Sequence, residues 1–204
     1  AKEGGVKQFM IKAVENALLG SSDAVVVLTK KHRAHLEKDP ITKNRIFPLE
    51  VIPCCVDLDR FRLSVTSSNN KRFTFMYLGK FGPLYFINEL LDYFVTFQGF
   101  RQDAQLLFAT QDEPANFYEL CRRKKIGMED IRICRPTFLE IPGLISGSDC
   151  GIFFINPEKK FGSSPIKMGE FLSCGIPVVT NSGIGDTEEL IDKYKVGTIV
   201  RDFS

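Results

Sequence analysis

The sequence has no large excess of charge of either sign and no long apolar run. Lysine and arginine number 27 against 25 aspartates and glutamates, which leaves a net charge of +2. A balance this close gives no reason to expect a nucleic-acid partner or strong attraction to a membrane surface. No apolar stretch is long enough to span a bilayer, and no secretory signal is present. We therefore expect a protein of the cytoplasm.

Metal-binding and disulfide patterns are also missing. No cysteine belongs to a Cys-x-x-Cys pair, and the only histidines are His32 and His35. Hydrophobic residues make up 44% of the chain, enough for a core that needs no disulfide framework. Free thiols are therefore expected at all six cysteines, which are Cys54, Cys55, Cys121, Cys134, Cys150 and Cys174.

The glycine fingerprint of dinucleotide-binding enzymes is absent, which weakens the case for a dehydrogenase. In its place Gly79-Lys80-Phe81-Gly82 follows an expected strand and opens an expected helix. Glycine lets a backbone approach a ligand closely, and Lys80 would add positive charge beside a helix N-terminus that favours anions. Two glycines at such a turn also serve packing in many α/β proteins, so the turn alone decides nothing.

Short apolar runs alternate with longer amphipathic ones. This alternation predicts an α/β protein, a Rossmann-like parallel sheet with helices on both faces. The expected helices cover residues 85–98, 114–126, 166–174 and 187–193, with Pro114 as a first helical residue and Gly175 just past a helix end. The expected strands cover residues 24–29, 73–78, 105–110, 131–135, 150–155, 177–180 and 197–200.

A polar stretch divides the chain. Residues 63–72 (LSVTSSNNKR) have little apolar content, and residues 51–61 lead into them. Before this stretch lie only a helix, a strand and a second helix, too little to bury a core. We therefore assign residues 1–50 to the end of an N-terminal domain, 51–72 to a linker and 73–204 to a C-terminal domain.

Residues 161–170 (FGSSPIKMGE) carry the clearest hint of a ligand. Ser164 is a good N-cap and Pro165 a good first helical residue. Lys167 would then lie in the first turn, where a cation opposes the helix dipole unless an anion binds nearby. Glu170, one turn on, could accept hydrogen bonds from a ribose diol. The alternative is an exposed Lys–Glu pair, which the spacing alone favours.

The loop after the strand at 177–180 contains Gly183, Gly185 and Asp186. Its glycines would leave the backbone free to approach a ligand. Asp186 is expected to cap the following helix, with Glu189 as its capping-box partner.

Three segments resemble the retaining glycosyltransferases of the GT-B fold, the family called glycosyl transferases group 1. Residues 163–191 (SSPIKMGEFLSCGIPVVTNSGIGDTEELI) are similar to its donor-binding signature, in a Ser-Ser-Pro-x-Lys variant. Residues 51–61 (VIPCCVDLDRF) resemble its interdomain linker, and residues 21–36 (SSDAVVVLTKKHRAHL) the last strand and helix of its N-terminal domain.

The resemblance implies a reaction and its partners. The chain would supply the donor-binding half of an enzyme that moves a hexosyl group from a nucleoside diphosphate sugar to an acceptor, with retention at the anomeric carbon. The acceptor would be a glycan or a lipid-linked molecule, the full-length protein would be peripheral to the membrane, and the pathway would build a polysaccharide. No metal or other cofactor is expected, because lysines and helix dipoles can stabilise the departing diphosphate. The family's domain continues past the position of Ser204.

Site residues carry over position by position. Lys80 and Lys167 would be the catalytic cations, and Glu170 would bind the ribose. The residues lining the diphosphate would be Gly79, Ser163, Ser164, Pro165 and Ile166, and Arg135, Pro136 and Thr137 would frame the base.

The chain departs from the family at two places. The first glutamate of the family's pair falls at Gly162, and its usual Lys-Gly pair is replaced by Leu84-Tyr85. Both changes leave the donor sugar undefined. Two other functions stay open: a nucleotide-sugar epimerase of the same fold, and a non-catalytic module that binds a nucleotide or a partner.

Overall fold

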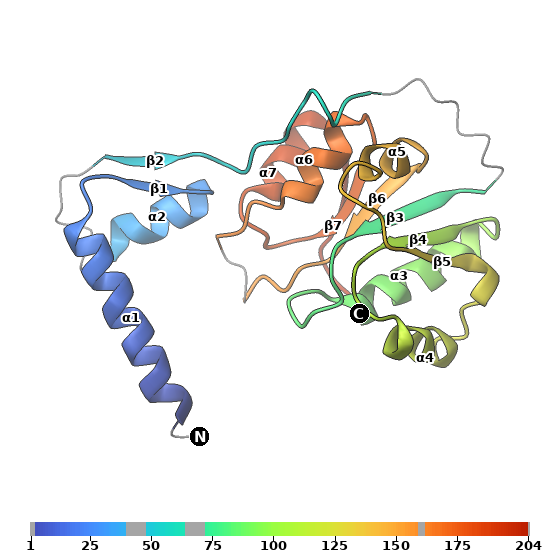
Figure 1. The fold of residues 1–204 in the computed structure, drawn as a ribbon, viewed down its shortest axis with the longest axis horizontal. Coiled ribbons are helices and arrows are strands. Elements are labelled where there is room, and N and C mark those ends of the chain that lie inside the picture. The colour runs from blue at the N-terminus through green and yellow to red at the C-terminus, as the bar shows by residue number, and fades with distance from the viewer. Residues whose placement is uncertain (1–2, 40–47, 64–71, 159–161, 204) are drawn as a thin grey trace.

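The computed structural model describes residues 3–39, 48–63, 72–158 and 162–203 (Figure 1). A six-stranded parallel sheet forms the centre of the C-terminal part, in the order β5-β4-β3-β6-β7-β8. Its strands are β3 (Thr74–Leu78), β4 (Gln105–Ala109), β5 (Ile131–Cys134), β6 (Cys150–Phe153), β7 (Val178–Asn181) and β8 (Gly197–Val200).

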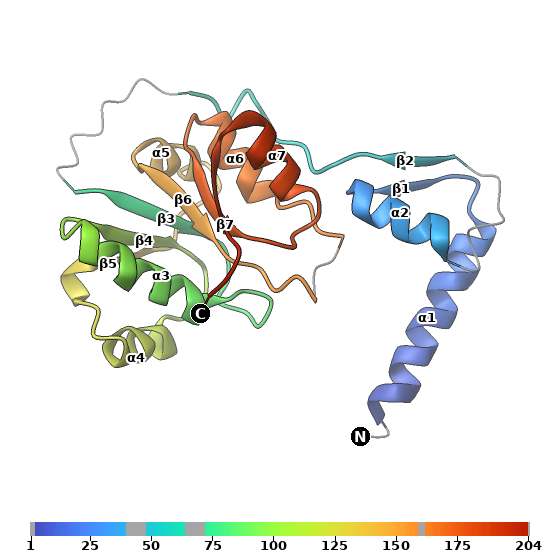
Figure 2. The same ribbon diagram turned by 180° about the vertical axis from the view of Figure 1, so that it is seen from behind.

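Helices cover both faces of this sheet. Figures 1 and 2 show α3 and α4 on one face and α5, α6 and α7 on the other. The expected α/β fold, Rossmann-like with a parallel sheet, is confirmed. The helices are α3 (Ile87–Phe100), α4 (Ala115–Arg123), α5 (Ile141–Ser146), α6 (Ile166–Ser173) and α7 (Thr187–Tyr194), with a 3-10 turn η1 (Met128–Asp130) before β5.

The core is rich in aromatic side chains because both faces of the sheet are covered. Tyr77 of β3, Phe108 of β4, Phe153 of β6 and Phe171 of α6 are all fully buried. The backbone of the central strands approaches the helices closely: a methyl group on Gly151 would lie 2.6 Å from the Phe171 ring. Position 151 therefore has no room for a side chain.

The N-terminal part forms a separate, smaller unit. It consists of α1 (Glu3–Ser21), β1 (Val25–Val27), α2 (Lys30–Lys38) and β2 (Leu49–Val51). Strands β1 and β2 pair in parallel in a two-stranded sheet of their own. Apolar side chains of α1 are exposed, among them Phe9 and Leu18. None of the described helices is long and apolar enough to cross a membrane.

Several expected boundaries shift. Helix α4 begins at Ala115, with Pro114 as its N-cap, and it ends at Arg123 rather than at 126. Lys125, with a positive φ of 58°, turns the chain just past the helix. Gly175 has a φ of 79° just past α6, which confirms the expected glycine stop. Strand β2 was not expected: it needs β1 as a partner, and periodicity over three residues does not show that.

Candidate functional site

The C-terminal ends of β3 and β6 meet at the point where the strand order reverses. From β3 the chain runs outward to β4 and β5, and then returns to β6 on the other side of β3. Neighbouring loops diverge at such a point and leave a crevice, which is where open α/β sheets bind ligands. The turn after β3, which contains Gly79, and the start of α6, which contains Lys167, border this crevice.

Gly79 has a backbone conformation that suits only glycine. Its φ is 139°, and a methyl group on it would lie 2.8 Å from the Lys167 amino nitrogen. Two hydrogen bonds fix the turn after Gly79. The Phe81 amide donates to the Asp112 carboxylate (2.6 Å), and the Tyr77 hydroxyl donates to the Lys80 carbonyl. Gly79 is therefore required by conformation and by the close approach of Lys167. The Lys80 side chain is exposed.

The Lys167 amino group lies in an aromatic cage. Its nitrogen is 4.3 Å from the ring centre of Tyr85, 5.1 Å from that of Tyr77 and 5.8 Å from that of Phe153. It is buried and has no hydrogen-bond partner among the described residues. Burial lowers the pKa of Lys167 to about 7, against an opposing effect of Glu170, while the rings favour the ammonium form. A buried amine without an acceptor is well prepared to bind an anion.

Glu170 lies one turn further along α6 and is also buried, with only 7% of its surface exposed. Burial raises the pKa of its carboxyl, and the nearby Lys167 works in the opposite direction. The alternative of an exposed surface pair is wrong, because neither side chain is on the surface. Both belong to the first two turns of a helix that begins at the crevice.

The start of α6 differs from the expectation. The helix begins at Ile166, Pro165 is its N-cap, and no side chain caps it. The Ser164 hydroxyl instead accepts a hydrogen bond from the Cys54 amide (3.1 Å). The N-cap role of Ser164 is therefore wrong, because an amide distant in the sequence donates to its oxygen. The first amides of α6 are left without a side-chain partner, next to Ser163 and Lys167.

Asp186 also has another role than the expected one. Its carboxylate accepts hydrogen bonds from the amides of Lys30 (2.6 Å) and Lys31 (3.3 Å), so it caps α2 of the N-terminal unit. No side chain caps α7. Glu189 pairs with the Lys30 amine at 2.6 Å instead of closing a capping box. The expected box is wrong because the packing of the two units brings in competing donors.

The loop after β5 is occupied by its own contacts. Arg135 forms an ion pair with Glu113 (2.7 Å), and the Pro136 carbonyl accepts from the Gln111 amide group (2.8 Å). Thr137 donates through its amide and hydroxyl to Glu140, which lowers the pKa of that carboxyl. The loop shares the C-terminal edge of the sheet with the crevice, but β4 separates it from β3.

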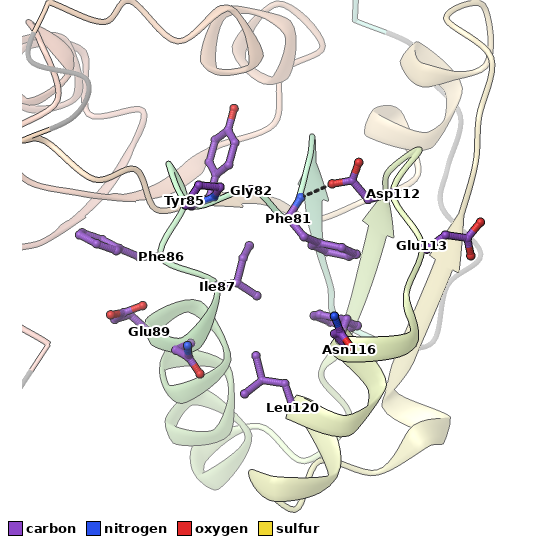
Figure 3. Close-up of a pocket in the computed structure, with 13 residues that line it drawn as sticks. Phe81, Gly82, Tyr85, Phe86, Ile87, Glu89, Asp112, Glu113, Asn116 and Leu120 are labelled. Carbon is purple, nitrogen blue, oxygen red and sulfur yellow. Dashed lines mark hydrogen bonds between the residues drawn. The ribbon is translucent and has the colours of Figure 1, made fainter. Parts of the chain in front are cut away.

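A cavity of about 530 Å³ opens beside the turn after Gly79 (Figure 3). Phe81, Ile87 and Leu120 form much of its wall, between the start of α3 and α4. Tyr85, which contacts Lys167, also belongs to the wall.

Sequence reasoning missed the cage. Tyr77, Tyr85 and Phe153 come from three separate segments and read singly as ordinary core aromatics. The replacement of the family's Lys-Gly pair by Leu84-Tyr85 was the only signal, since it put an aromatic ring where a glycine was expected.

Comparison with known proteins finds similar folds among solved structures but no match in sequence. No model of a known family matches the chain, and no curated protein matches it in sequence. Among solved structures it is similar to "WaaG, a glycosyltransferase involved in lipopolysaccharide biosynthesis", with a TM-score of 0.68 and 17% identity. It is also similar to the pneumococcal O-GlcNAc transferase GtfA "in complex with UDP and GlcNAc", with a TM-score of 0.66 and 12% identity. A third similar structure is the C-terminal domain of a glycosyl transferase group 1 family protein, LpcC from Francisella tularensis, with a TM-score of 0.57 and 16% identity.

The coverage shows how these proteins relate to the chain. The alignments with WaaG, GtfA and the LpcC domain cover 86%, 84% and 72% of this chain. It spans only 48% of the WaaG chain and 33% of the GtfA chain, but 80% of the LpcC domain. The chain therefore has the fold of GT-B glycosyltransferase domains, and it corresponds in extent to about half or less of the first two proteins.

Proposed function

We propose that this chain is the donor-binding half of a nucleotide-sugar-dependent glycosyltransferase that transfers a hexosyl group with retention at the anomeric carbon. The observation that carries the proposal is the buried amine of Lys167. It lies against Gly79 at the start of α6, and no described residue satisfies its hydrogen bonds. A diphosphate would supply the missing acceptors.

Different residues of the site bind different parts of the donor. The diphosphate lies at the uncapped start of α6 (Ser163 to Ile166) and against Gly79, where helix amides favour negative charge. Glu170 accepts hydrogen bonds from the ribose diol. Residues 135–137 frame the base once their side chains rearrange. The proposal is supported by the solved glycosyltransferases that share this fold.

The chemistry follows from where charge develops. When the bond between the sugar and the diphosphate breaks, negative charge grows on the leaving oxygen. Lys167 and the exposed Lys80 stabilise it together with the α6 dipole. These cations stabilise the charge on the leaving diphosphate, as a metal ion does in other transferases. We therefore propose no metal and no other cofactor.

The acceptor belongs to the other half of the protein. We propose a glycan or lipid-linked acceptor. This is supported by the similar fold of WaaG, which is described as involved in lipopolysaccharide biosynthesis. A lipid-linked acceptor would place the full-length protein at the surface of a membrane, on its cytoplasmic side.

The test is nucleotide binding by the chain and by a Lys167→Met variant, which keeps the volume and removes the charge. Calorimetry with UDP, GDP and the parent nucleosides should show binding of at least one diphosphate. The variant should bind it about tenfold or more weakly and the nucleoside almost unchanged. Lys193→Met, an exposed lysine of α7, is the matched control. Absence of any nucleotide binding by the unmodified chain would refute the proposal.

Product analysis on the full-length protein tests the reaction itself. The anomeric configuration of the product, measured by NMR against that of the donor, should be unchanged. Conversion of the sugar nucleotide into an epimer without any acceptor would identify an epimerase instead. Nucleotide binding with neither reaction would identify a binding module.

A further inference from the structure

The amine of Lys167 is enclosed without a hydrogen-bond acceptor. Its nitrogen is shielded from solvent and has no hydrogen-bond partner among the described residues, and no described carboxylate forms an ion pair with it. In water an ammonium group keeps its N–H donors bonded, and the enclosure supplies no acceptor for them. The charged form of this side chain therefore loses its hydration without a replacement.

Aromatic rings and the Glu170 carboxyl are the neighbours of the amine. The rings of Tyr77 (β3), Tyr85 and Phe153 (β6) lie against it, and Glu170 follows on the next turn of α6. Burial raises the pKa of the Tyr77 hydroxyl, so this phenol is neutral, and burial also raises the pKa of the Glu170 carboxyl. Among these side chains Glu170 is the carboxylate whose charge acts on the amine.

The charged residues of the neighbouring turns do not pair with the amine. The turn after β3 contains Lys80, whose side chain is exposed. The turn after β4 contains Asp112, whose carboxylate accepts from the Phe81 amide and forms no ion pair with Lys167. Among the described residues, burial, the rings and Glu170 therefore decide whether Lys167 is protonated.

Burial is the strongest of these influences. It lowers the pKa of Lys167 to about 7, while the charge of Glu170 works in the opposite direction. The ring faces also attract a cation, but they replace only part of the lost hydration. In the chain without a ligand the amine is therefore largely neutral at pH 8 and largely protonated at pH 6.

A sugar nucleotide reverses this balance. Its diphosphate is ionised throughout the neutral range, and its oxygens accept strong hydrogen bonds from an ammonium group. Negative charge at hydrogen-bonding distance favours the protonated amine and raises its pKa. The ligand itself does not titrate near pH 7, because the sugar esterifies the terminal phosphate.

We propose that donor binding is coupled to the uptake of a proton by the Lys167 amine. The proton comes from solvent and converts the neutral amine into the ammonium form that pairs with the diphosphate. This inference rests on the proposed function, in which Lys167 binds the diphosphate. The complex binds more protons than the free chain, so affinity falls as the pH rises above about 7. Donor affinity is thereby regulated by pH within the neutral range.

Calorimetry in two buffers measures the proton directly. UDP-glucose, UDP-N-acetylglucosamine and GDP-mannose are titrated into the chain at pH 8.0, once in HEPES and once in Tris, which differ in their enthalpy of ionisation. The difference between the observed heats should correspond to an uptake of ~0.9 proton per bound ligand, given a pKa of about 7. Affinity for the same ligand should fall about fivefold to tenfold between pH 7.5 and pH 8.5.

Two lysine variants assign the proton to its group. Lys167→Met has nothing to titrate, so it should bind without proton uptake and with the same weak affinity at both pH values. Lys193→Met, which removes an exposed lysine of α7, is the matched control and should keep the uptake of the unmodified chain. Circular dichroism must show that both variants are folded.

NMR tests the same point without a substitution. In a chain labelled with ¹³C at the lysine Cε atoms, one signal should titrate near pH 7 when no ligand is present. The same signal should stay at its protonated position up to pH 9 when the sugar nucleotide is bound. A free chain in which no lysine signal titrates near pH 7 would overturn the inference.

The outcomes separate the inference from the proposed function. No nucleotide binding by the unmodified chain refutes the proposed function. Binding with equal heats in both buffers refutes only the proton coupling, since it shows that the amine is already charged in the free chain. Uptake that persists in folded Lys167→Met refutes the coupling as well, because another group then takes up the proton.

Discussion

At the scale of single residues, the site depends on burial. Lys167 and Glu170 are polar side chains that the surrounding rings and helices remove from water. Such burial costs free energy unless a partner compensates for it, and it is typical of binding sites rather than of surfaces. The sequence predicted both residues and their spacing. It did not predict their burial, which depends on Tyr77, Tyr85 and Phe153 from three distant segments.

The ribose role of Glu170 has a direct test. Glu170→Ala should cost ~1–3 kcal/mol of nucleotide affinity, since a buried ribose hydroxyl loses its acceptor. The cost should be much smaller against the 2′,3′-dideoxy nucleotide, which has no diol. Calorimetry on the folded variant measures both, with the exposed Glu119→Ala as control. Equal losses for the two ligands would assign Glu170 a purely structural role.

Lys167 should also make stability depend on pH. Its pKa is about 7 in the folded chain against an ordinary value of 10.5, so the unfolded chain binds more protons between these values. Stability should therefore rise with pH above about 7, by up to ~1.4 kcal/mol per pH unit. Favourable contact of the ammonium form with the aromatic rings makes the rise smaller.

Urea unfolding at pH 7.0 and pH 8.5 measures this effect. The rise in the free energy of unfolding should be smaller in Lys167→Met, which has nothing to titrate. The upper limit stays below the ordinary thiol pKa of 9.0. Burial raises the pKa of Cys121 to about 11 and that of Cys150 to about 12, so above that value the unfolded chain would lose thiol protons first and stability would fall. An identical pH dependence in both chains would show that the amine stays charged in the folded protein.

At the scale of elements, the sequence predicted the sheet better than the ends of its helices. All six strands of the C-terminal domain lie within two residues of their expected bounds, because a strand covered on both faces is a continuous apolar run. Helix ends were less predictable, as at Ser164 and Asp186, because a cap depends on which donors lie nearby. Helix α5 has only six residues and was missed, since periodicity needs a longer window.

A substitution at Asp186 removes its cap on α2 without changing any residue of α2. Asp186→Ala should destabilise the first turn of α2 by ~1 kcal/mol, since two amides lose a charged acceptor. Hydrogen exchange should become faster at Lys30 and Lys31 and stay unchanged in α7, which Asp186 does not cap. Asp192→Ala, an exposed residue of α7, is the control. Faster exchange confined to α7 would favour the original capping box.

At the scale of the whole molecule, the two units are unequal. The C-terminal domain has a continuous core, whereas the N-terminal unit is two helices and a two-stranded sheet with Phe9, Met10 and Val14 exposed on α1. All the residues assigned to nucleotide binding lie in the C-terminal domain. Acceptor binding in the proposed function would need more of the N-terminal half than these elements.

The 204-residue chain should therefore bind a nucleoside diphosphate but not transfer sugar. Transfer needs two halves that close over the donor and exclude water. The measurement is turnover of radiolabelled UDP-glucose and GDP-mannose with lipid extracts or glycans as acceptors, beside calorimetry on the same preparation. The full-length protein is the positive control. Robust turnover by the chain alone would show that its few N-terminal elements suffice.

The close approach of Gly162 and His32 has an evolutionary consequence. The two positions lie 130 residues apart in the sequence, yet they compete for one volume. A methyl group on Gly162 would lie 2.7 Å from His32 Nδ1, so a side chain at position 162 requires the imidazole to move or a smaller residue to stand at position 32. Substitutions at the two sites should therefore be correlated among related sequences, with histidine at 32 found mostly beside glycine at 162.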